Sequence, residues 1–79
     1  MIIGSDPYLT VFDPARIRLR LACLADKVAA THDQLAGTYD LLAQSRPHDA
    51  ARLRARAARA RDNAQAERDL ADRYRTSPP

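Results

Sequence analysis

The feature that most constrains this chain is a row of side chains spaced alternately four and three residues apart through its first half. We call it the leucine row, and it consists of Ile17, Leu21, Leu24, Val28, Thr31, Leu35, Thr38 and Leu42. Because this spacing repeats every seven residues, an α-helix would place all of these side chains on one face. A face this regular needs a second helix to cover it. The pattern therefore predicts an all-α fold class.

Local signals place the first helix at about 14–45. Asp13 can accept a hydrogen bond from the first free N–H groups of the helix, and Pro14 suits the first helical position. Gly37 is the one weak point, but the leucine row keeps its phase through it, so we expect a continuous helix. A kink or break at Gly37 is the alternative. Pro47 disfavours a helical Arg46, which predicts a short turn after the first helix.

The second helix is expected at about 47–75 and carries an alanine-rich row of its own. We call it the second row, and it consists of Ala50, Leu53, Ala57, Ala60, Ala64, Glu67, Ala71 and Tyr74. Since the connection is short, the two helices must run antiparallel. Alanine lets two helix axes approach to about 8 Å, so we expect the side chains of the leucine row to pack between those of the second row.

Size and leftover apolar groups predict self-association. A chain of 79 residues buries only about 60% of its unfolded surface, and Cys23 has no second cysteine to pair with. Leu19, Tyr39 and Leu41 lie off the leucine row and would stay exposed in a single hairpin. We therefore expect hairpins to assemble into a homo-oligomer, as a four-helix bundle. The residues expected at the seam between the helices or at the oligomer interface are Ile17, Leu21, Leu24, Val28, Leu35, Leu42, Leu53 and Tyr74.

The chain divides into three parts: an extended arm at 1–13, the hairpin at 14–76 and a frayed tail at 77–79. The segment 8–12, Tyr-Leu-Thr-Val-Phe, is rich in strand-forming residue types but has no partner strand in the sequence. We expect the arm to lie against the helices, within one chain or across a subunit interface. The alternative is a loosely ordered terminus.

Positive charge is concentrated in the second half of the chain. Residues 1–40 carry a net charge of −1, whereas residues 41–79 carry +4. Both shoulders of the second row hold arginines that we predict to contact a partner or an anion, namely Arg52, Arg54, Arg56, Arg59, Arg61 and Arg68. The facing flanks of the first helix carry no acid, so these arginines are expected to lack partners within the hairpin. The acidic residues Asp26, Asp33 and Asp40 are expected roughly opposite the leucine row.

Three residues spaced four apart, Arg61, Gln65 and Asp69, loosely resemble the ligand-reading face of cyclic-di-GMP-binding antiparallel hairpins among actinobacterial anti-sigma factors. That family's motif would have Glu and Ser where this chain has Arg54 and Ala58, and the first helix holds no second copy. No function is carried over from this resemblance.

No pattern in the sequence predicts chemistry. His32 and His48 are sixteen residues apart without a companion cluster, so we expect no catalytic residue, metal site or cofactor. No apolar run approaches the roughly 20 residues that span a bilayer, and no targeting segment is visible. The excess of arginine over lysine and of aspartate over glutamate is typical of a GC-rich bacterial genome. We interpret the protein as bacterial, cytoplasmic and without a membrane partner.

These observations favour a small non-enzymatic interaction module, an adaptor or regulatory subunit that binds itself and another protein through helical faces. The alternative is an arginine-mediated nucleic-acid-binding protein. Six arginines between residues 46 and 61 could make several phosphate contacts. However, no aromatic side chain lies among them for base stacking.

Overall fold

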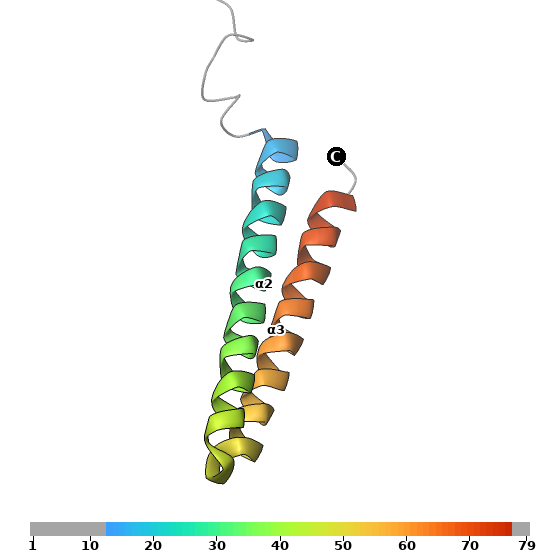
Figure 1. Ribbon diagram of the computed structural model, residues 1–79. Helices are drawn as coiled ribbons and strands as arrows, with labels where there is room; N and C mark the ends of the chain where they lie inside the picture. The colour runs from blue at the N-terminus through green and yellow to red at the C-terminus, as the bar shows by residue number, and fades with distance from the viewer. Residues whose placement is uncertain (1–12, 77–79) are drawn as a thin grey trace, which may run out of the picture.

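The computed structural model describes residues 13–76, and its two long helices lie side by side in antiparallel directions (Figure 1). The elements in chain order are α2 (Pro14–Ser45), the short 3-10 helix η1 (Pro47–Asp49) and α3 (Ala50–Thr76). No strand occurs in this part of the chain. The structure confirms an all-helical hairpin. Residues 1–12 of the predicted arm and the tail at 77–79 lie outside the described residues.

The first turn of α2 forms as its sequence dictates. The carboxylate of Asp13 accepts a hydrogen bond from the backbone N–H of Ala15 at 3.1 Å, and Asp13 itself is extended. Pro14 occupies the first helical position, where a missing N–H costs nothing. The helix then continues through Gly37 without a break, over 32 residues or about 48 Å.

The turn is set by proline at Pro47. Arg46 is not helical, with φ −131° and ψ 76°, because the ring of the following proline crowds the helical conformation. The backbone N–H of Asp49 donates to the carbonyl of Arg46 at 3.0 Å, which closes a 3-10 turn. α3 therefore begins at Ala50, three residues later than the sequence predicts. Arg73 and Arg75 in its last turn complement the negative end of the helix dipole.

The contact between α2 and α3 is built from alanines. On α2 the buried side chains form what we call the α2 alanine row, namely Ala22, Ala25, Ala29, Ala36 and Ala43. On α3 they belong to the second row, with Leu53 as the single large member, followed by Ala57, Ala60, Ala64 and Ala71. Two tyrosines cover these clusters. Tyr74 packs on Ala22, Ala25 and Ala71, and Tyr39 packs on Ala36, Ala57 and Ala60.

This arrangement corrects the predicted contact on α2. The leucine row was expected to pack against α3, but its exposed members include Leu24, which retains 56% of its accessible surface, and Leu35, which retains 42%. The α2 alanine row follows the leucine row by one residue throughout, so both rows repeat every seven residues. One residue corresponds to a rotation of about 100° around the helix axis. That rotation brings small side chains to the contact and turns the bulky ones outward.

Candidate interaction surface

The main candidate site is the leucine row, which follows α2 along the outside of the hairpin. Ile17, Leu21, Leu24, Val28 and Leu35 are the exposed large apolar members of the row, and Leu42 at its end is half-buried. Thr31 and Thr38 continue the row as exposed side chains. Each threonine hydroxyl donates at 3.1 Å to the carbonyl four residues earlier, which leaves its methyl group available for contacts. The row is thus a nearly continuous apolar stripe that α3 does not cover.

Two more leucines of α2 are exposed away from this row. Leu19 and Leu41 retain 58% and 67% of their accessible surface, as the sequence predicts for both. Tyr39, which was expected to be exposed with them, instead packs half-buried against Ala57 and Ala60. It reaches that contact because it lies in phase with the α2 alanine row.

Basic side chains border the N-terminal part of the leucine row. A shallow hollow on α2 has Leu19, Leu24 and Cys23 as its less polar lining, and Arg16, Arg20 and Lys27 as its rim. Cys23 is an exposed free thiol. Large apolar groups framed by cations form a surface that favours a partner with both apolar and acidic groups.

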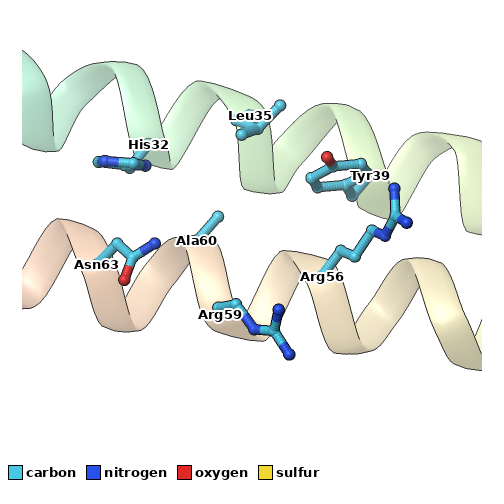
Figure 2. Close-up of a pocket in the computed structure, with 7 residues that line it drawn as sticks. All are labelled: His32, Leu35, Tyr39, Arg56, Arg59, Ala60 and Asn63. Atoms are coloured by element: carbon cyan, nitrogen blue, oxygen red, sulfur yellow. The ribbon is translucent and has the colours of Figure 1, made fainter.

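A second hollow lies between the helices beside Leu35 (Figure 2). From α2 it is lined by His32, Leu35 and Tyr39, and from α3 by Arg56, Arg59, Ala60 and Asn63. In Figure 2 the side chain of Arg56 extends toward the ring of Tyr39, whereas that of Arg59 points away from α2. Within residues 13–76 no buried side-chain polar atom lacks a hydrogen bond, and no group of His, Cys, Asp and Glu could hold a metal ion. Because Leu35 lines this hollow and belongs to the leucine row, the hollow continues the row toward α3.

Three ion pairs join α2 and α3 along the edge of the hairpin that lies away from the leucine row. Arg75 donates to Asp26, Arg68 to Asp33 and Arg61 to Asp40, and all six side chains are partly exposed. We call this set the ion-pair ladder. Both partners repeat every seven residues, in opposite directions along the chain, so the pairs recur at regular intervals down the antiparallel contact. The hydrogen bond to Asp26 raises the pKa of Arg75 above its ordinary value, against a smaller opposing effect of desolvation.

The ion-pair ladder overturns one expectation from the sequence. Arg61 and Arg68 do not lack partners in the hairpin, because each pairs with one of the aspartates expected on the side of α2 away from the leucine row. The cause is the same one-residue rotation of α2. With the α2 alanine row in the contact, each of the ladder aspartates directly follows a residue in phase with that row and faces the matching edge of α3.

The remaining predicted arginines lie nearer the turn. Arg52 pairs with Asp49 at 3.1 Å, three residues earlier. Arg54, Arg56 and Arg59 are exposed and form no ion pair with any residue in the described range 13–76. Gln65 donates to Asp69 at 3.0 Å. Since Arg61 contacts Asp40, the three residues that resemble a nucleotide-reading face are all engaged within the chain.

Leu53 and Tyr74, which the sequence groups with the interface, contact α2 within the hairpin. Leu53 is buried and Tyr74 is half-buried in the cluster around Ala71. The structure therefore separates the predicted interface residues into two sets. Leu53 and Tyr74 belong to the contact inside the hairpin, and the leucine row faces outward.

The sequence alone did not lead to the α2 alanine row, because the heptad positions with the largest apolar side chains were expected to form the helix contact. A usable signal was present in the charges. Asp26, Asp33 and Asp40 have the same spacing as Arg61, Arg68 and Arg75, and antiparallel helices bring such matched edges together.

In the described part of the chain, neither helix combines the length and the apolar character that crossing a bilayer requires. Comparison with known proteins found no matching family model, no similar curated protein and no similar solved structure. The functional argument therefore depends on the geometry of the hairpin.

Proposed function

We propose that this chain is a non-enzymatic helical interaction module, an adaptor or regulatory subunit whose binding surface is the leucine row. One observation carries the proposal: the hairpin builds its own contact mainly from alanines and leaves most of the large apolar side chains of α2 outside. Leu24 and Leu35, for example, are more exposed than any member of the α2 alanine row.

A hairpin that is stable alone would bury its large apolar side chains between its helices, whereas this hairpin exposes most of those on α2. Large side chains stabilise a fold most when they are buried, at about 1.5–3 kcal/mol for each Leu, Ile or Val. A stripe of them at heptad spacing on the outside is the pattern of a helix that packs on another helix. The partner is accordingly expected to be helical, with an apolar stripe of its own.

The proposal is tested with a photo-crosslinking amino acid placed at single positions in living cells of the native host. Position 24 lies in the leucine row, and position 55 is a matched exposed control on α3. We expect a covalent adduct with a protein from position 24 and none from position 55. The adduct should disappear when Leu21 and Val28 are replaced by Gln in a chain that keeps its helical content.

The controls decide what the result means. Adducts of equal yield from positions 24 and 55 would show that crosslinking at the leucine row is non-specific. A complete absence of protein adducts from Leu24, Leu21 and Leu35 would remove the proposal. In both cases circular dichroism must first show that each variant is as helical as the original chain.

Nucleic-acid binding is the second candidate, and the exposed arginines near the turn favour it. Arg54, Arg56 and Arg59 are not occupied by carboxylates of the described residues. Against it, the ion-pair ladder already engages Arg61 and Arg68. If phosphate contacts exist, the affinity for duplex or single-stranded nucleic acid should fall by about 0.7–0.9 logarithmic units per contact for each tenfold rise in salt.

A matched pair of variants tests that candidate. Replacing Arg54, Arg56 and Arg59 with Gln should flatten the salt dependence, whereas replacing the ladder residues Arg61 and Arg68 should not. Weak binding with the same salt dependence in both variants would rule out a dedicated arginine surface.

A further inference from the structure

We infer that the partner of the leucine row is a second copy of this chain, packed antiparallel along α2 with a two-fold axis close to Ala30. The inference rests on the proposed function and specifies the partner and its orientation. It is carried by two independent observations, the order of side chains within the row and the distribution of charge along the hairpin.

The leucine row is self-complementary when it is read in opposite directions. An antiparallel copy places Ile17 against Leu42 and Leu24 against Leu35. The other two layers join Val28 with Thr31, next to the axis, and Leu21 with Thr38. Every layer then contains at least one large aliphatic side chain, and each threonine methyl group is covered by Val or Leu.

A parallel copy is less complementary. In that orientation each residue meets its own equivalent, so Thr31 faces Thr31 and Thr38 faces Thr38. Two of the layers would then hold four hydroxyl groups and no large apolar group. Since apolar burial drives association of exposed helix faces, the antiparallel order makes better use of the same row.

Charge along the hairpin favours the same orientation. The half that contains the turn, residues 29–61, holds six basic and three acidic side chains. The open half, residues 13–28 with 62–76, holds seven basic and six acidic side chains. The first has a net charge of +3 and the second of +1. Antiparallel packing places each strongly basic half beside a nearly neutral one, whereas parallel packing brings the two strongly basic halves together.

The charges of α2 alone point the same way. Its N-terminal half carries Arg16, Arg18, Arg20 and Lys27 with a single acid, Asp26, and the segment 29–45 carries no lysine or arginine. In an antiparallel pair of α2 helices, the basic end of each copy lies along a segment of the other that has no lysine or arginine. Arg20 and Lys27, which border the row, are then not opposed by basic residues of the partner α2.

The test is directed disulfide formation in the 79-residue chain, with Cys23 replaced by Ser to remove the native thiol. Two single variants, Leu24→Cys and Leu35→Cys, carry tags of different size and are mixed under reducing conditions before oxidation. The antiparallel register predicts a mixed 24–35 disulfide as the main product. Two copies of position 24 would be about 16 Å apart along the axis, well beyond the roughly 7 Å between Cα atoms that a disulfide spans.

A second pair and a control complete the design. Ile17→Cys mixed with Leu42→Cys should also give the mixed product, while Ala55→Cys on the outer face of α3 should give no specific dimer. Sedimentation equilibrium of the unmodified chain should show a dimer at micromolar concentration. Predominant 24–24 and 35–35 products would overturn the antiparallel orientation.

A monomer at every concentration, with no specific disulfide, would overturn the second copy as partner. The photo-crosslinking experiment would then separate the remaining explanations. An adduct between position 24 and a different protein would leave the proposed function standing. An internal crosslink to residues 1–12 would show that the chain's own N-terminal segment covers the row.

Discussion

A matched pair of truncations distinguishes the contact inside the hairpin from the outward-facing row. Leu53→Ala removes a side chain that is only 8% exposed and lies in the contact between α2 and α3. Leu24→Ala removes the same atoms from a side chain that is 56% exposed in the hairpin. Because the chemical change is identical, the difference in free energy of unfolding reports burial.

The expected magnitudes follow from these exposed fractions. Leu→Ala removes three carbon groups, which contribute about 0.8 kcal/mol each when fully buried. Leu53→Ala should cost about 2–3 kcal/mol, since cavity formation adds to the lost transfer free energy. Leu24 has less than half of its surface removed from water in the hairpin, so its truncation should cost no more than about 1 kcal/mol. The higher helix propensity of alanine reduces even this cost slightly.

Urea denaturation followed by circular dichroism measures both variants, at protein concentrations that span dissociation of the proposed dimer. At the lowest concentration Leu24→Ala should be nearly neutral. At the highest it should approach the cost of Leu53→Ala, because the proposed second copy would then cover the row and add to the apparent stability. Leu41→Ala, a change outside the row, should be neutral throughout.

The outcome that refutes this reasoning is equally specific. If Leu24→Ala costs as much as Leu53→Ala when the protein is monomeric, then Leu24 lies in the contact inside the hairpin. The rotation of α2 described above would be wrong, and the leucine row would be the internal contact that the sequence alone suggests.

Three further changes test other parts of the hairpin. Asp33→Asn and Arg68→Gln should each lower the free energy of unfolding by at most about 1 kcal/mol; in the double variant the losses should not add, and strict additivity at low salt would show that the pair does not form. Gly37→Ala should raise the stability by about 1 kcal/mol, since an added methyl group would meet no atom within 4 Å; a loss in thermal denaturation would reveal a contact there. Asp13→Ala should cost about 1 kcal/mol through loss of the helix cap, whereas Asp13→Asn should keep most of it, and equal melting temperatures for the two would argue against the cap.

The fold was predictable because its determinants are local. Asp13 and Pro14 start one helix, Pro47 ends the connection, and the heptad spacing between them requires a second helix. Each of these signals acts within a few residues and needs no knowledge of the partner surface. The later start of α3 was less accessible, because a proline at the first position is compatible with both a 3-10 and an α-helical turn.

The rotation of α2 was harder to predict because it depends on a competition between two rows with the same period. The leucine row offers more apolar area, which argues for burying it inside the hairpin. The α2 alanine row lets the helices approach closely and brings Asp33 and Asp40 to the edge where Arg68 and Arg61 lie. A ranking by hydrophobicity alone selects the leucine row. Adding the charge pattern of both helices selects the alanine row, as the structure has it.

The division between small buried and large exposed side chains also links folding to binding. Among the ten buried apolar residues of the described hairpin, nine are alanines. Alanine contributes little apolar area, so a single hairpin gains less from its own contact than a leucine-packed pair would. Most of the exposed large apolar side chains of the described hairpin lie on the leucine row, where α3 does not cover them. A partner that covers it would add to the stability of the whole hairpin by mass action. The ion-pair ladder, on the opposite edge, stays exposed in that arrangement, so it can hold the register of α2 and α3 without competing with the partner for the row.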